Sequence, residues 1–132
     1  MGQAIKSVLI VEDEIFIAME IERILSEAGY DVVDIAADRS RALSAAANAE
    51  LAFVDLNLRD GQTGPELAHE LAARHGLRIV YVTANPTQIG EPAPTAIGCI
   101  RKPFTERAIL AAAAMAARIA TSPPGHEEVM KI

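Results

Sequence analysis

The chain has 132 residues, of which 51% are hydrophobic, and it carries 18 acidic against 12 basic residues, giving a formal net charge of −6. This length fits one domain with one core, and the acidic excess argues against general nucleic-acid binding, which needs a basic surface. The single cysteine, Cys99, excludes an internal disulfide and a multi-cysteine zinc site. We expect a cytoplasmic protein, because no apolar run approaches the roughly 20 residues that cross a bilayer and no signal peptide is recognisable.

Short apolar runs alternate with helical patterns along the chain. Strands are predicted over residues 7–11, 32–36, 51–54, 77–82 and 97–100. Apolar residues at helical spacing predict helices over residues 15–28, 39–48, 63 to about 72, and 105–119. Ile15 belongs to the predicted buried stripe of the first helix, and Gly29 closes that helix. Asp38 is a predicted N-cap, and Thr63 with Glu66 predicts a capping box.

Two segments depart from this alternation. Residues 85–96 contain Pro86, Pro92 and Pro94 together with Gly90, a density that predicts a loop or one or two helical turns in place of a helix. Residues 121–132 open with a Thr-Ser-Pro-Pro-Gly sequence and predict a short mobile tail after a domain that spans residues 1–120.

Alternating strands and helices predict a five-stranded parallel sheet with helices on both faces, in which ligands bind outside the carboxyl ends of the strands. The residues that leave the predicted strand ends are Glu12, Asp13, Asp55, Thr83, Ala84, Asn85, Arg101, Lys102 and Pro103. Three carboxylates at one edge repel one another unless a cation neutralises them, and oxygen ligands suit magnesium. Neither Cys99 nor the histidines His69, His75 and His126 have the spacing of a zinc or copper site.

Four short motifs at these strand ends resemble the receiver domain of two-component response regulators. They are Val11-Glu12-Asp13-Glu14, Val54-Asp55-Leu56-Asn57-Leu58, Val82-Thr83-Ala84 and Lys102-Pro103-Phe104. The resemblance extends from Val8 to about Ile119. It implies a flavodoxin-like doubly wound fold with strand order 2-1-3-4-5.

The resemblance also implies a role for each matching position. Asp55 is expected to accept a phosphoryl group from a phosphohistidine on a sensor histidine kinase or a histidine phosphotransfer protein. A magnesium ion, or manganese in its place, is expected at Glu12, Asp13, Asp55 and the backbone carbonyl of Asn57. Lys102, the Thr83 hydroxyl and the Ala84 backbone amide are expected to bind the phosphoryl oxygens, and the Lys102–Pro103 bond is expected to be cis.

The sequence departs from the family pattern on the usual output face. Members often carry an aromatic residue where this chain has Cys99, which we expect to be a small buried residue, and residues 85–96 replace the usual fourth crossover helix. We therefore expect the output to run through an order change in residues 85–96. A similar segment occurs in some receivers fused to stress-response sigma-factor mimics. Asn57 and Asn85 occupy positions that in this family tune the lifetime of the phosphate.

No output domain is expected after the last helix, so the resemblance implies a freestanding signalling protein, a relay intermediate or a phosphate sink. The downstream target is unknown, and neither a nucleic acid nor a membrane is an expected partner. The alanine-rich face of the last helix favours core packing, with a monomer or weak dimer as the expected state. Two rivals stay open: a receiver-like binding module that is never phosphorylated, and an aspartate-nucleophile phosphatase, which needs an acid where this chain has Asn57.

Overall fold

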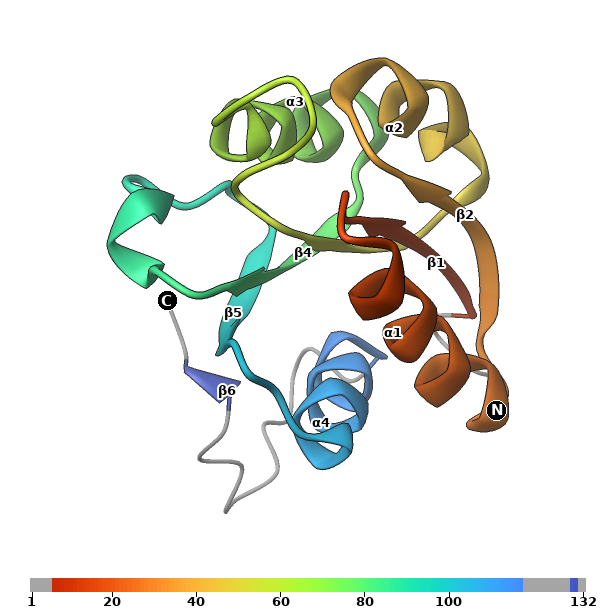
Figure 1. The fold of residues 1–132 in the computed structure, drawn as a ribbon. Helices are drawn as coiled ribbons and strands as arrows, with labels where there is room; N and C mark the ends of the chain where they lie inside the picture. The colour runs from red at the N-terminus through yellow and green to blue at the C-terminus, as the bar shows by residue number, and fades with distance from the viewer. Residues whose placement is uncertain (1–5, 118–128, 131–132) are drawn as a thin grey trace.

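The computed structural model describes residues 6–117 and 129–130, and these form an open sheet flanked by helices (Figure 1). The strands are β1 (Ser7–Val11), β2 (Asp31–Ala36), β3 (Leu51–Val54), β4 (Arg78–Thr83), β5 (Ala96–Arg101) and β6 (Val129–Met130). The helices are α1 (Ile15–Glu27), α2 (Arg39–Ala45), α3 (Gly64–His75) and α4 (Glu106–Ala117), with single 3-10 turns at η1 (Ala46–Asn48) and η2 (Pro86–Ile89).

The sheet has the order β2-β1-β3-β4-β5-β6, and its first five strands are all parallel. The predicted order 2-1-3-4-5 is therefore confirmed. Because the strands are parallel, their carboxyl ends all lie at one edge of the sheet. The strand order reverses between β1 and β3, since β2 lies on one side of β1 and β3 lies on the other. That edge carries the residues on which the site depends.

Alternate residues of the central strands pack into two cores on opposite faces of the sheet. Val8, Ile10 and Phe53 face α1 and α4, whereas Leu9 and Val54 face α2 and α3. Figure 1 shows these two helix pairs on opposite sides of the sheet. The near-continuous apolar runs of β1 and β3 are explained by burial on both faces.

The structure confirms some of the predicted helix ends and corrects others. Gly29 follows α1 with φ +97, and the Asp38 side chain accepts a hydrogen bond from the Arg41 backbone N–H at the start of α2. Thr63 lies at the N-cap position of α3 but makes no capping bond: its backbone is helical (φ −93, ψ −7) where a capping residue is usually extended, and its hydroxyl donates to Asp60 Oδ1 at 2.6 Å. The predicted capping box is therefore wrong. Ile15 was also placed wrongly, since it starts α1 with 55% of its surface exposed.

The segment between β4 and β5 contains a single 3-10 turn, η2, as its prolines predicted. Its remaining residues are held to the domain by polar contacts. The Ala93 N–H donates to the hydroxyl of the fully buried Tyr81 at 2.9 Å, and the Asn85 N–H donates to Thr83 Oγ1 at 3.0 Å. A ring nitrogen of His69 on α3 lies 2.8 Å from the carbonyl oxygen of Glu91.

A two-residue strand, β6, joins the sheet beside β5 and was not predicted. It runs antiparallel to β5, with Met130 opposite Cys99 and Val129 opposite Ile100. The rest of the predicted mobile tail, residues 121–128 and 131–132, lies outside the described residues. Within the described part of the chain, no helix has the length and apolar character needed to span a membrane.

Candidate functional site

Four neighbouring strands deliver polar side chains to the carboxyl edge of the sheet. Glu12 and Asp13 follow β1, Asp55 follows β3, Thr83 ends β4, and Lys102 follows β5. Glu12, Asp55 and Thr83 are buried at this edge, with 3%, 6% and 0% of their surfaces exposed. The β strands therefore hold these polar groups in place from a rigid apolar base.

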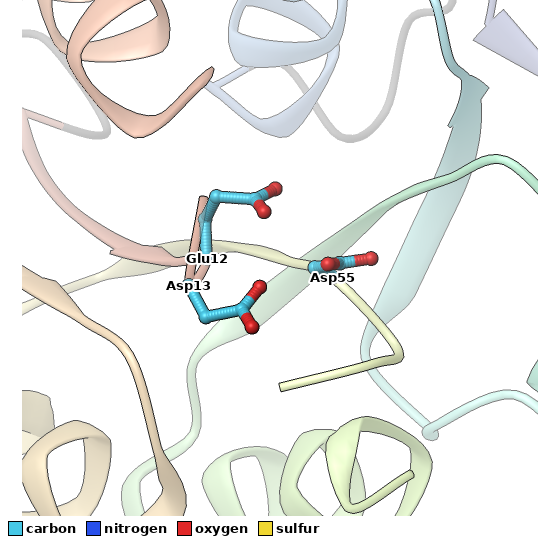
Figure 2. A group of neighbouring side chains, drawn as sticks. All are labelled: Glu12, Asp13 and Asp55. Atoms are coloured by element: carbon cyan, nitrogen blue, oxygen red, sulfur yellow. The ribbon is translucent and has the colours of Figure 1, made fainter. Parts of the chain in front are cut away.

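Glu12, Asp13 and Asp55 form an acidic cluster. Each of the three offers a carboxylate oxygen, and these oxygens lie within 4.8 Å of one another (Figure 2). Asp13 is exposed while the other two carboxylates are buried, so the cluster opens to solvent on the Asp13 side. The prediction that these acids meet is confirmed.

Lys102 forms ion pairs with both buried carboxylates of this cluster. Its Nζ lies 3.0 Å from Glu12 Oε1 and 3.5 Å from Asp55 Oδ2, and its side chain is 14% exposed. Glu12 Oε1 is buried and, among the described residues, has no hydrogen bond of good geometry despite this close charge contact. Lys102 thus contacts two of the three carboxylates, Glu12 and Asp55, and the cluster offers further oxygen atoms to a second cation.

The pKa values of the site follow from burial and crowding. Burial and the neighbouring Asp55 charge raise the pKa of Glu12 from 4.5 to about 7. Burial also raises the pKa of Asp55, against the lowering effect of Lys102. Burial by itself lowers the pKa of Lys102, but its contacts with Glu12 and Asp55 outweigh burial and raise that pKa. The cluster therefore resists holding two buried negative charges without a cation.

The backbone around Asp55 fixes its carboxylate. Asp55 N–H donates to the Val11 carbonyl at 2.9 Å, and the Leu56 N–H donates to Asp55 Oδ1 at 2.8 Å. One carboxylate oxygen is thereby held by the backbone, while Oδ2 is the oxygen nearest Lys102. Gly64 at the start of α3 packs against this stretch, and its N–H donates to the Leu56 carbonyl at 3.1 Å.

Thr83 and the residues after it border the acidic cluster. The Lys102 N–H donates to the Thr83 carbonyl at 2.9 Å, which joins the ends of β4 and β5. The Lys102–Pro103 peptide is cis, as the resemblance implied, and Ala84 is exposed beside the site. The Thr83 hydroxyl accepts a hydrogen bond from Asn85, so the first residue of the 85–96 loop is tied directly to it.

Two contacts of the site were not predicted from the sequence. The exposed Asn57 side chain donates to Gln88 Oε1 at 3.0 Å, which links the loop after β3 to η2. Tyr81 holds Ala93 from within the core. A tyrosine in a strand that is otherwise apolar could have signalled the second contact, since a buried hydroxyl needs a partner. Cys99 is buried, as expected, and burial raises the pKa of its thiol.

An apolar hollow of about 480 Å³ lies beside the cluster. Its lining residues are Phe16, Ile17, Glu20, Ala84, Lys102, Pro103 and Phe104. Phe16 is 83% exposed, and Met19 on the same helix is 51% exposed. Large apolar side chains left in solvent beside a hollow that reaches Lys102 indicate a contact surface.

The donor set of the cluster fits a hard divalent cation. Glu12, Asp13 and Asp55 offer only oxygen ligands, and one of these oxygens, Glu12 Oε1, is buried without a hydrogen bond from any described residue. Magnesium prefers such oxygens and is usually held by one or two carboxylates with water completing the shell. The backbone carbonyl of Asn57, two residues after Asp55, is a proposed additional ligand.

The fold and this edge define an α/β protein with an acidic site at the switch point of a parallel sheet. Residues 8–114 match the family model described as the response regulator receiver domain. The chain therefore belongs to the response regulator receiver family, as its motifs predicted.

Relatives and solved structures agree with this assignment. The chain is 32% identical over 103 residues to the phyllosphere-induced regulator PhyR of Methylorubrum extorquens, and 30% identical over 110 residues to the sensory transduction protein RegX3 of Mycobacterium tuberculosis. These alignments cover 74% and 80% of this chain. The solution structure of the Erythrobacter litoralis PhyR receiver domain superposes with a TM-score of 0.78 at 29% identity, covering 92% of this chain and 97% of that one.

The match to the curated relatives is confined to part of their length. It covers 38% of the Methylorubrum regulator and 48% of the mycobacterial protein. The crystal structure of PhyR from Brucella abortus also has a TM-score of 0.78, with 89% of this chain and 50% of that chain covered. The chain therefore spans half or less of these proteins, and the comparisons assign its receiver domain.

Proposed function

We propose that this chain is a response regulator receiver domain that accepts a phosphoryl group on Asp55 in a magnesium-dependent reaction. The observation that supports this most is the placement of the Asp55 carboxylate. It is buried at the end of β3, with Lys102 Nζ 3.5 Å away and Glu12 and Asp13 beside it. A nucleophile and the charges needed to receive a phosphoryl group therefore lie on one edge.

The phosphodonor is proposed to be a phosphohistidine on a sensor histidine kinase or a histidine phosphotransfer protein. An Asp55 oxygen attacks phosphorus, an O–P bond forms, and the N–P bond of the phosphohistidine breaks. The imidazole leaves with the electron pair and takes a proton from solvent. Bound magnesium supplies positive charge that offsets the repulsion between the carboxylate and the phosphoryl group.

The protein residues around Asp55 then hold the product. Lys102 gives a mobile point charge to a phosphoryl oxygen. The Thr83 hydroxyl and the Ala84 backbone amide are proposed to donate hydrogen bonds to the other oxygens. Hydrolysis by water returns the Asp55 carboxylate and inorganic phosphate, so the only expected chemistry is self-phosphorylation and self-dephosphorylation.

The surface formed by Phe16 and Met19 is proposed to receive the phosphodonor protein. It borders the hollow that reaches Lys102, so a protein that packs there can bring its histidine to Asp55. The acidic balance of the chain favours a protein partner over a nucleic acid. The downstream target is proposed to be a protein whose binding depends on the phosphoryl group.

Phosphorylation is proposed to act on the 85–96 loop. In the structure the Thr83 hydroxyl accepts the Asn85 N–H, so a Thr83 hydroxyl recruited to a phosphoryl oxygen gives up or reorients that bond. The Asn57–Gln88 hydrogen bond also links the loop to Asn57, which lies two residues after Asp55 in the acidic cluster. Hydrogen exchange with and without beryllofluoride tests this: unchanged protection over residues 85–96 excludes the loop as the output.

The phosphorylation itself is tested by intact-mass measurement after incubation with acetyl phosphate and magnesium. A gain of one phosphoryl group that Asp55→Asn abolishes supports the receiver. Steady release of phosphate at high turnover supports the phosphatase, although the Asn57 amide is too weak an acid to serve as its general acid. No adduct from acetyl phosphate or phosphoramidate supports the unphosphorylated binding module.

A further inference from the structure

The two edges of the sheet differ in how they are protected against another strand. The β2 edge carries charge within the strand itself: Asp34 lies in its middle and pairs with Arg41 at 2.7 Å. Charged residues in an edge strand discourage pairing with other chains. In β5 the run from Ala96 to Ile100 has no charged residue and no proline, and only Arg101 at its end is charged.

The fourth crossover also leaves the β5 side lightly covered. A crossover helix at this position would run beside β5, but η2 is a single turn of four residues and the rest of the segment is irregular. On the other face, α4 packs against β5. The N–H and C=O groups on the side of β5 away from β4 are therefore available to another strand. Backbone groups of this kind require hydrogen-bond partners.

The structure shows what lies there. Val129 and Met130 form β6, which pairs antiparallel with Ile100 and Cys99 and leaves the first part of β5 without a strand partner on that side among the described residues. The pairing falls on the regular half of β5, since its register shift lies at the Ala96–Gly98 end. A pairing of only two residues is short for a strand, and its few hydrogen bonds make it exchangeable.

We propose that the outer edge of β5 is a docking surface for an extended apolar segment of a partner protein, which adds to the sheet antiparallel to β5 and displaces β6. Strand addition to an exposed sheet edge is a recurring mode of peptide recognition, in which backbone hydrogen bonds supply affinity. The chain's own Val129–Met130 segment already pairs in this way and shows the antiparallel orientation that the edge accepts. The proposal goes beyond phosphoryl transfer and does not depend on it.

The experiment uses the full chain and one substituted chain, Val129→Pro/Met130→Pro, without any phosphodonor. Proline has no backbone N–H, so the pair removes the donors of β6 and leaves the β1–β5 domain untouched. The probe is a fluorescent peptide with the sequence of residues 125–132, GHEEVMKI, followed by anisotropy. Because the resident strand no longer competes, the peptide should bind the proline chain at least about tenfold more tightly than the unsubstituted chain.

A matched control separates backbone pairing from side-chain contacts. Val129→Thr/Met130→Thr retains both backbone donors and should behave like the unsubstituted chain. Hydrogen exchange should also rise at residues 98–101 in the proline chain alone and fall again when the peptide is added. A peptide with proline at both strand positions should bind neither chain.

The result that overturns the proposal is equally specific. The proposal is wrong if the proline chain fails to bind the peptide, or if exchange at residues 98–101 is the same in all chains. If the proline chain dimerises without peptide, a second copy occupies the edge and the assignment to a partner is wrong. Should the proline chain not fold, peptide titrated into the unsubstituted chain must speed exchange at Val129 and Met130, and constant exchange there excludes displacement.

Discussion

Gly64 packs directly against the backbone that carries Asp55. A Cβ placed on Gly64 would overlap the Asp55 carbonyl oxygen and would lie 2.5 Å from the Leu56 Cα, closer than real Cβ contacts allow. Both obstacles are backbone atoms, which cannot swing aside as the tip of a side chain can. The start of α3 therefore sets the position of the buried carboxylate.

Gly64→Ala should lower both the stability of the fold and the rate at which Asp55 is phosphorylated. We expect a loss of about 1–3 kcal/mol in the free energy of unfolding, because overpacking forces a backbone shift, together with slower labelling of Asp55 by acetyl phosphate. Urea unfolding and intact-mass time courses measure the two effects. Gly76→Ala is the control: its φ of +68 also disfavours alanine, but no atom lies within 4 Å of the added Cβ. Equal labelling rates in the two variants would contradict the role of Gly64.

Magnesium should stabilise the folded chain through Asp13. Binding to the folded state alone adds about 1.4 kcal/mol at a concentration ten times the dissociation constant. The midpoint of thermal unfolding should therefore rise with magnesium chloride in the unsubstituted chain and stay nearly constant in Asp13→Asn. Sodium chloride at matched ionic strength controls for screening, and Asp31→Asn removes an exposed carboxylate at the opposite end of the sheet. A magnesium response that survives Asp13→Asn would place the ion elsewhere.

Metal-free protein should lose stability as the pH rises from about 4.5 to about 7, because the pKa of Glu12 is raised to about 7 in the folded state. In this interval the folded chain binds more protons than the unfolded chain, so the free energy of unfolding falls with pH. The raised pKa of Asp55 acts with the same sign. The Glu12 contribution is on the order of 3 kcal/mol over the full interval.

Glu12→Gln removes this titration and should flatten the pH dependence, as measured by urea unfolding in the presence of a chelator. Glu91→Gln changes an exposed carboxylate on the 85–96 loop and should leave the slope unchanged. The same slope in both variants would mean that Glu12 is not the group that titrates.

Tyr81→Phe should loosen the 85–96 loop without disturbing the core. The ring remains, but the buried Ala93 N–H loses its acceptor, which costs about 1–3 kcal/mol. Thermal unfolding and hydrogen exchange over residues 85–96 report the two consequences. Tyr30→Phe makes the same chemical change on a partly exposed ring, and its effect should stay within about 0.5 kcal/mol. If exchange in the loop is unaffected by Tyr81→Phe, the hydroxyl does not anchor it.

Phe16→Ala should slow phosphoryl transfer from a histidine kinase without changing transfer from acetyl phosphate. Acetyl phosphate is small and needs no protein surface, so labelling of Asp55 by it should be unchanged. Transfer from the histidine kinase that labels the unsubstituted chain should slow by roughly tenfold or more, since an exposed aromatic at the centre of a contact surface contributes over 1 kcal/mol. Leu110→Ala on the partly buried face of α4 is a control away from this surface. Equal transfer rates would exclude Phe16 from donor binding.

The sequence predicted the strands and the acidic edge because both depend on local patterns. Leu51 to Val54 is apolar and ends at an acid, and parallel strands bring such ends together wherever they lie in the chain. Contacts that depend on three-dimensional neighbours could not be predicted in this way. The closeness of Gly64 to Asp55, the bond between Tyr81 and Ala93, and the strand at Val129–Met130 each join segments whose approach no residue pattern records.

The predictions for Ile15 and Thr63 were wrong because a residue pattern does not include tertiary neighbours. Ile15 fits the apolar period of α1, but it lies in the first turn, beyond the sheet edge, where no core covers it. Thr63 has the right spacing to Glu66, but its backbone is helical and its hydroxyl is turned to donate to Asp60 Oδ1 at 2.6 Å. In both cases a tertiary neighbour, present or absent, decided the outcome.

The buried face of α4 consists largely of methyl groups. Ala108, Ala112 and Ala116 have no side-chain torsion to readjust when the helix moves, whereas longer residues would interlock with β5. A bulkier residue at any of these three positions would therefore push α4 away from β5. Because α4 begins four residues after Lys102, such a displacement would act directly on the stretch of chain that carries this lysine.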